Sequence, residues 1–434
     1  VDDIGEVAAE YRDRIYTSYF SGTKELVGRD KVINFLETAQ KAIEQTIDTN
    51  KREDGLYHAY NLVNLDNDEI SINRLSEMLE GQVGILSSGY LSDDESLSVL
   101  DSLKSSSLFW DEQYSYILYP NKDLLGFLDK NIIPENELNK SSLLTLLVKD
   151  GNNQIVVKDI KDKFHFNGLF HNASCLVSEL ENLPSEYIKL AKEETDIILE
   201  IFERVFDHKS FTGRSGTFYG YEGLGSIYWH MVSKLLLASV EVTQRSIDNN
   251  SNPKTIGRLF DHYFEINEGI GVNKSPELYG AFPTDPYSHT PRGRGVQQPG
   301  MTGQVKEDVI SRFHELGFYV NDGKITFEPT VLRKSEFIDE EKSFKFVNLD
   351  NEITYMDLNA NSLVFTVCQV PIIYNLSDKE DIKIIANDGG EEIIDGHELN
   401  FEHSQNIFNR TNLIKAVHVR VRKWKNHFLS LYFF

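Results

Sequence analysis

The chain changes character within Thr302-Gly-Gln-Val-Lys-Glu-Asp-Val-Ile-Ser-Arg-Phe-His-Glu-Leu-Gly-Phe-Tyr-Val-Asn-Asp-Gly-Lys-Ile-Thr-Phe327. Its first part has a helical period, with Thr302 as N-cap and an apolar stripe of Val305, Val309, Phe313 and Leu316. Glu307 and Asp308 lie off that stripe in the first turns, so we expect carboxylates that are solvated or favoured by the helix dipole. The last part alternates apolar and polar residues, the period of a β-strand.

The chain before this stretch has the spacing of helices, and its connections are long and rich in Gly, Pro, Asn and Asp. Ser92 and Glu95 form a capping box. Helix pairs with long loops favour an (α/α)6 toroid, complete or incomplete, over a compact bundle. A hairpin is expected at 154–157 and 164–168. The expected helices cover 7–20, 31–47, 70–90, 92–103, 143–147, 183–206, 223–247, 252–267 and 303–316.

After about residue 323 the strand period persists, and Asp388-Gly-Gly is a turn signal. A β-sandwich of about 100 residues fits this length. We therefore predict a mainly α protein with two domains, a helical toroid over 1–322 and a C-terminal β-sandwich over 323–434. The expected strands are 324–327, 344–347, 362–374, 382–386 and 416–421.

Composition narrows the class of protein. The 434 residues are 40% hydrophobic, enough for a sizeable core, and the net charge of −24 opposes binding to nucleic acid or anionic membranes. Cys175 and Cys368 are expected to be buried thiols, with a disulfide as the alternative. No apolar run spans a membrane. The chain opens at Val1, so we expect a piece of a longer product or a removed leader, and a cytoplasmic or, with a leader, periplasmic protein.

Residues 280–304 read Gly280-Ala-Phe-Pro-Thr-Asp-Pro-Tyr-Ser-His-Thr-Pro-Arg-Gly-Arg-Gly-Val-Gln-Gln-Pro-Gly-Met-Thr-Gly-Gln304. The prolines and glycines exclude a helix or a central strand. Polar and aromatic groups on such a rigid loop are typical of binding and catalysis. An Arg pair clamps carboxylate or phosphate, and amides suit sugar hydroxyls. The candidates are Asp285, His289, Arg292, Arg294, Gln297 and Gln298.

A second candidate segment, residues 213–231, is a Gly-rich loop that leads into the helix expected at about Gly223. Glu222 would then sit at a helix N-terminus, which favours a carboxylate, whereas burial against nearby rings favours the protonated acid. Those rings belong to Tyr219, Tyr221 and Trp229. An N-cap role for Glu222 is the alternative to a catalytic one.

A third segment, residues 52–61, is a turn-forming aromatic loop that offers His58, Tyr60 and Asn61 as donors to hydroxyls. The alternative is a helix-joining loop whose rings pack on the domain. His165 and His171 have no convincing metal spacing, so we expect hydrogen-bonded structural histidines and no metal site.

Several of these segments resemble a bacterial family of the six-hairpin glycosidase superfamily, which includes glycoside phosphorylases and hydrolases. The resemblance lies in Tyr219-Gly-Tyr-Glu-Gly-Leu-Gly-Ser-Ile-Tyr-Trp-His230, Asp285-Pro-Tyr-Ser-His-Thr-Pro-Arg292, Gln298-Pro-Gly-Met-Thr-Gly-Gln304 and Cys368-Gln-Val-Pro371. It implies an (α/α)6 toroid paired with β-sandwich domains and an oligosaccharide or polysaccharide as substrate.

Cleavage of a glycosidic bond needs two carboxyl groups across the bond, and our pair is Glu222 and Asp285, with Glu307 and Glu80 in reserve. In a phosphorylase, inorganic phosphate replaces the second group and would be bound by His289, Arg292 and Arg294. No other cofactor is expected.

Two further hypotheses stay open. A non-catalytic oligosaccharide-binding protein would use the same rings without a carboxyl pair. A polysaccharide lyase would use Tyr60, His58 and His289 as base and acid, with Arg292 neutralising a uronate. The oligomeric state is open as well.

Overall fold

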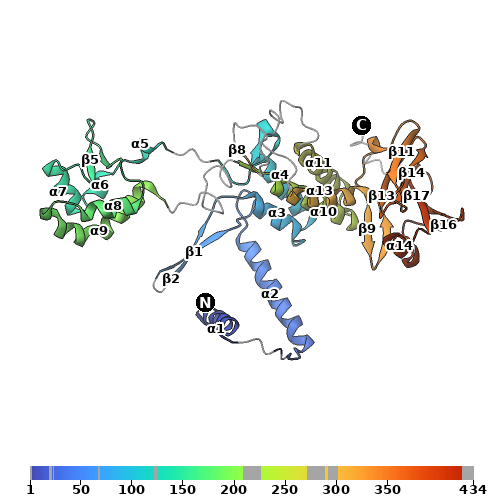
Figure 1. Cartoon of the computed structure of the whole chain (residues 1–434), viewed down its shortest axis with the longest axis horizontal. Coiled ribbons are helices and arrows are strands. Elements are labelled where there is room, and N and C mark those ends of the chain that lie inside the picture. The colour runs from blue at the N-terminus through green and yellow to red at the C-terminus, as the bar shows by residue number, and fades with distance from the viewer. Residues whose placement is uncertain are drawn as a thin grey trace. The chain divides into compact units, whose positions relative to one another are not determined.

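The computed structural model describes residues 2–18, 22, 24–66, 69–121, 125–208, 226–270, 289–291 and 302–422, and Figure 1 labels its elements in chain order. Contacts divide the chain into two units, 1–52 and 53–434. The boundary predicted near residue 322 stays a prediction. None of the described helices is long and apolar enough to span a bilayer.

The first unit holds two helices, α1 (Asp2–Thr17) and α2 (Arg29–Thr49), close to the predicted ranges. No residue of α2 is buried. Its apolar stripe therefore makes no core within this unit.

The second unit begins with helices and short hairpins. The helix predicted over 70–90 is wrong in its first half, because Ile70 and Ile72 alternate along strand β2 (Glu69–Arg74), which pairs with β1 (Asn61–Asp66). Helix α3 runs only from Leu79 to Ser87. Helix α4 (Asp93–Ser105) follows, with the predicted capping box in place.

Helix α10 (Trp229–Asp248) contacts α3, α4, α11 (Pro253–Gly269) and α13 (Thr302–Leu316) (Figure 1). We call these five helices the helical part. Valines and leucines such as Val232, Leu235 and Val240 are fully buried along α10. Strand β7 (Ser226–Tyr228) precedes α10, so the predicted start at about Gly223 is wrong. Strand β8 covers His289–Pro291, and β3 (Phe109–Trp110) and β4 (Ser115–Tyr116) flank a 3-10 turn, Asp111–Gln113.

Residues 125–208 have a hydrophobic core of their own, built from side chains such as Leu144, Leu176, Ile198 and Phe202. The predicted hairpin is present here. Helix α8 was not predicted, although its N-cap Asn172 accepts from the amide of Cys175, which is a readable signal. The elements are α5 (Phe127–Lys130), α6 (Glu135–Leu138), α7 (Ser142–Asp150), β5 (Val156–Lys158), β6 (Phe164–Phe166), α8 (Ala173–Glu181) and α9 (Ser185–Phe206).

The C-terminal part is a five-stranded mixed sheet of order β13-β14-β17-β15-β16, in which β14 and β17 are parallel. The single strand predicted over 362–374 is broken at Cys368 and Gln369, whose φ angles of 49° and 69° make a tight turn. Its strands are β13 (Ser362–Val367), β14 (Val370–Ser377), β15 (Asp381–Ala386), β16 (Glu391–Asp395) and β17 (Ile414–Arg422).

Other elements cover both faces of this sheet. Alternate residues of a strand point to opposite faces, so each face packs against a different set of side chains. Ile372 and Val417 share one core with β9 (Phe318–Asn321), β10 (Lys324–Phe327) and α14 (Phe401–Phe408). Ile373 and Ala416 pack with side chains of β11 (Lys342–Val347) and β12 (Ile353–Leu358) on the other. Cys175 and Cys368 are free and half-buried, so no disulfide joins them.

Candidate functional site

The two segments predicted to carry the chemistry, residues 213–231 and 280–304, each contribute one strand to a two-stranded β-ladder. Strands β7 and β8 are antiparallel, with Ser226 opposite Pro291, Ile227 opposite Thr290 and Tyr228 opposite His289. The segment that contains Glu222 therefore enters the ladder at the end from which the segment that contains Arg292 leaves.

Most of the predicted site residues lie outside the described residues. These are Glu222, Asp285, Tyr219, Tyr221, Arg292, Arg294, Gln297 and Gln298. Their roles stay predictions. What the structure describes next to them in the chain is the β7–β8 ladder, helix α10, which follows β7, and helix α13, the first described helix after β8.

A line of polar contacts runs from β7 to α13. The Tyr228 hydroxyl lies 3.2 Å from Nδ1 of His230, and Nε2 of His230 lies 3.2 Å from Oε1 of Glu307. We call these three residues the Tyr–His–Glu relay. Neither Tyr228 nor His230 was predicted as a site residue, because a helix was expected from about Gly223 and helical spacing does not reveal a partner 77 residues away.

Glu307 is 5% exposed, so the expectation that it is solvated is wrong. The reason is the rotation of α13: its polar face packs on α10, whereas Val305, Val309 and Phe313 of the predicted core stripe are 49%, 47% and 44% exposed. The neighbouring Asp308 is exposed, as expected. Partial burial of its carboxyl group nevertheless raises its pKa, the Ser233 hydroxyl opposes this, and the charge of Glu307 adds to it.

Trp229, the first residue of α10, is 3% exposed. That leaves almost none of the indole for a sugar ring to stack on. In this structure its ring belongs to the core of the helical part.

The loop that carries His58, Tyr60 and Asn61 is fastened to α3. Gln82, which is fully buried, accepts from the amide of Tyr57 at 2.9 Å and donates to its carbonyl at 2.8 Å. His58 Nδ1 lies 3.2 Å from the carbonyl oxygen of Leu75. Since α3 contacts α10, this loop belongs to the same helical part as the ladder. Gln82 thus holds this loop on α3 through the backbone of Tyr57.

Tyr60 is 41% exposed, and Asn61 opens strand β1. Both therefore lie at the transition from the loop to the β1–β2 hairpin. Their predicted contact with substrate stays a prediction.

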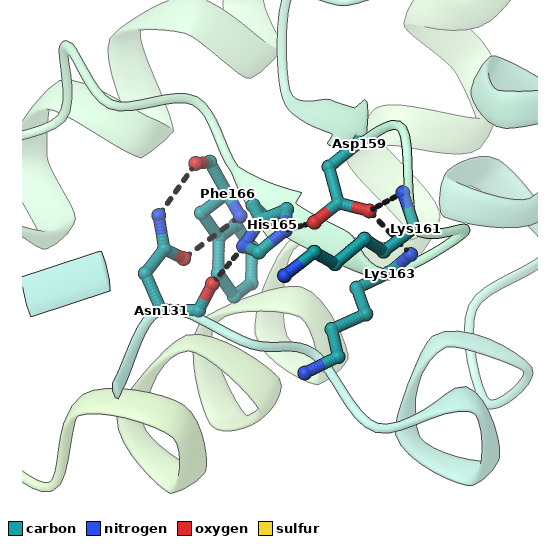
Figure 2. A network of polar contacts seen from close by, with 6 residues as sticks. All are labelled: Asn131, Asp159, Lys161, Lys163, His165 and Phe166. Carbon is teal, nitrogen blue, oxygen red and sulfur yellow. Dashed lines mark hydrogen bonds and ion pairs between the residues drawn. The ribbon is translucent and has the colours of Figure 1, made fainter. Parts of the chain in front are cut away.

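A polar network braces the β5–β6 hairpin, as Figure 2 shows. Asn131 clamps Phe166 in both directions, donating to its carbonyl at 2.8 Å and accepting from its amide at 2.9 Å. His165 contacts the Asn131 carbonyl through Nδ1 and lies 3.1 Å from Oδ2 of Asp159 through Nε2. His165 is thus the hydrogen-bonded structural histidine that we predicted.

Asp159 anchors the turn of this hairpin. Its Oδ1 accepts from the amides of Lys161 and Lys163, both at 2.8 Å. The hydrogen bond from the Lys163 amide, with help from His165, holds the pKa of Asp159 below its usual range. A group of this kind stabilises the fold above its unfolded pKa of about 4, and the contribution is lost as the pH falls through the lower, folded value.

We therefore expect acid to destabilise residues 125–208 less steeply in Asp159→Asn than in the wild type. Melting followed by circular dichroism from pH about 6 to about 2 measures this. The wild type should have the higher melting temperature at pH about 6, and the two curves should converge in acid. Parallel curves would contradict a role for the Asp159 charge.

Within the described part of the chain, no group of three or more His, Cys, Asp or Glu side chains could hold a metal ion. The Tyr–His–Glu relay supplies a hydroxyl, an imidazole and a carboxyl group. Proton transfer and hydrogen bonding are the chemistry that such groups support.

Comparison with known families relates one part of the chain to a described domain. Residues 124–209 match the family described as GH149 phosphorylase insertion domain 2. The matched range is close to residues 125–208, which have their own hydrophobic core. The match covers a minority of the 434 residues and relates the chain to glycoside phosphorylases. No curated protein matches the chain.

Proposed function

We propose that this chain is part of a carbohydrate-active enzyme related to the glycoside phosphorylases, which cleaves a glycosidic bond in a pocket built around the β7–β8 ladder. The match of residues 124–209 to a phosphorylase insertion domain is the observation that carries this proposal. The ladder supports it, because it ties together the two segments whose residue types suit sugar chemistry.

In this proposal Glu222 or Asp285 is the general acid. Its carboxyl group donates a proton to the glycosidic oxygen, and that oxygen leaves with the electrons of its bond to the anomeric carbon. A phosphate oxygen attacks the anomeric carbon, so the products are a sugar phosphate and a shortened oligosaccharide. The proton of the attacking hydrogen phosphate is released as the sugar phosphate forms and restores the acid, so one carboxyl group is sufficient.

Phosphate would be held by His289, Arg292 and Arg294. Guanidinium groups bind phosphate oxygens bidentately, and this would place two positive charges in a chain whose net charge is −24. The pairing of β7 with β8 supports this assignment. Ser226, which follows the segment with Glu222, lies opposite Pro291, which directly precedes Arg292 in the chain.

The finer architecture is part of the same proposal. Helices α3, α10, α11 and α13 would belong to an (α/α)6 toroid whose loops line the sugar-binding cleft, and the C-terminal strands to a β-sandwich. His58, Tyr60 and Asn61, next to α3, would reach sugar hydroxyls. Gln297 and Gln298 would do the same from the loop before α13.

Phosphate dependence tests this function. We expect a panel of oligosaccharides to yield sugar phosphate only when inorganic phosphate is present, measured by phosphate consumption and chromatography. Release of reducing sugar without phosphate would instead establish a hydrolase. Products that absorb in the ultraviolet would establish a lyase. Calorimetric binding without any product would establish a binding protein and would contradict the proposal.

A further inference from the structure

The α10–α13 interface buries polar groups where apolar ones would be expected. Glu307 and Ser311 of α13 are 5% and 2% exposed, and Ser233 of α10 is fully buried. Oε2 of Glu307 and Oγ of Ser311 have no hydrogen-bond partner among the described residues. Within the described part of the chain, the Glu307 side chain makes its hydrogen bond to His230.

A half-satisfied buried carboxylate weakens a fold. Taking its charge out of water costs several kcal/mol, and apolar residues of similar volume often stabilise such a site instead. Lys306 offers little compensation, since its Nζ is 3.8 Å from Oε1 and its side chain is 63% exposed. We therefore look for a role of Glu307 other than stabilising the packing of α10 against α13.

The contacts of His230 fix its hydrogen-bond roles. A carboxylate only accepts, so Nε2 of His230 must carry the proton that it donates to Glu307. In the neutral ring Nδ1 is then free to accept from the Tyr228 hydroxyl. The two contacts of the relay thus each join a donor to an acceptor, from the Tyr228 hydroxyl to Nδ1 of His230 and from Nε2 of His230 to Oε1 of Glu307.

We propose that the Tyr–His–Glu relay locks the β7–β8 ladder to α13, with Glu307 as the positioning residue. Tyr228 is the ladder residue opposite His289, and Glu307 lies in the helix that follows the loop carrying Arg292 to Gln298. The relay thus connects β7, which pairs with the strand before that loop, to α13, the helix after it. Its value for catalysis rests on the proposed function, but the lock itself does not.

Hydrogen exchange tests the lock without any substrate. In Glu307→Leu, the amides of β7 and β8 should exchange about tenfold faster than in the wild type, which corresponds to the loss of one hydrogen bond to a charged group. Global stability, measured by urea unfolding, should stay the same or rise, because a leucine replaces a buried charge. A purely structural role differs in the stability outcome, because stability and protection would then fall together.

Two variants control this comparison. Glu307→Gln keeps an acceptor for His230 and should restore near-wild-type exchange. Lys306→Ala removes the distant cation beside the same carboxylate and should leave exchange unchanged. Equal exchange rates in the wild type and Glu307→Leu would overturn the lock, as would faster exchange in Lys306→Ala.

The tautomer of His230 gives a second readout. Nitrogen-15 NMR of the imidazole should show the proton on Nε2 in the wild type and a mixture of tautomers in Glu307→Leu. An unchanged spectrum would also overturn the proposal. If Glu307→Leu fails to fold, Tyr228→Phe removes the other end of the relay, and the ladder should again exchange faster.

Kinetics separate the lock from the proposed function. With an active oligosaccharide, kcat of Glu307→Leu should fall about tenfold or more with little change in KM, because the groups are misplaced and not lost. Unchanged kcat would overturn the positioning role. A wild type without phosphate-dependent activity would contradict the proposed function alone, since the exchange and NMR results do not depend on it.

Discussion

Glu222→Gln and Asp285→Asn are the changes from which we expect the largest loss of activity, about 10²- to 10⁴-fold for whichever residue is the general acid. An amide has nearly the volume of the acid but no proton to give to the leaving oxygen. The measurement is the initial rate of sugar phosphate formation, with the melting temperature as a check that the fold is retained.

Glu80→Gln is the matched control. Glu80 lies in the first turn of α3, in the same helical part, and we kept it in reserve on sequence grounds. Its amide variant should retain activity. Wild-type turnover in both Glu222→Gln and Asp285→Asn would remove the pair from the mechanism, and a loss confined to Glu80→Gln would move the acid to α3.

Gly317→Ala should lower the stability of the protein strongly, although it adds a single methyl group. Gly317 ends α13 with a φ of 62°, and a Cβ there would lie 2.0 Å from the carbonyl carbon and oxygen of Glu328. The amide of Glu328 also donates to the Gly317 carbonyl at 2.7 Å, so the two backbones cannot separate without losing this bond. We expect a cost of about 3 kcal/mol, the upper end for overpacking, seen as a lower urea midpoint.

Gly389→Ala separates the two causes of this cost. Gly389 has a φ of 89°, but a Cβ there would meet nothing within 4 Å. It should lose only the conformational part, about 1–2 kcal/mol. Equal losses in the two variants would show that backbone contact at Gly317 is unimportant.

Local chemistry made part of the fold predictable. Ser92 and Glu95 fix the start of α4 through their own hydrogen bonds, and the β5–β6 hairpin follows from alternation and turn residues. The failures occurred where two periods coexist. Leu75 and Leu79 continue an apolar spacing that starts at Ile70, yet Ile70 and Ile72 pair with β1, and no local signal marks the change.

The segments that carry the site could be predicted from the sequence, but the residues that hold them in place, His230 and Glu307, could not. Rigid, polar loops identified 213–231 and 280–304, and the ladder joins them. Glu307 was misjudged because its partner His230 is 77 residues away, and helical periodicity cannot see such a partner. A stripe of valines predicts which side of a helix is apolar, and tertiary contacts decide which side is buried.

The position of β17 has a consequence for biosynthesis. This strand is the last of its sheet in the chain and lies in the middle, between β14 and β15. Until residues 414–422 have left the ribosome, β13–β14 and β15–β16 are two separate hairpins with unsatisfied edges. The C-terminal sheet must therefore assemble after synthesis of this segment, and a premature stop between residues 396 and 413 would leave two aggregation-prone hairpins.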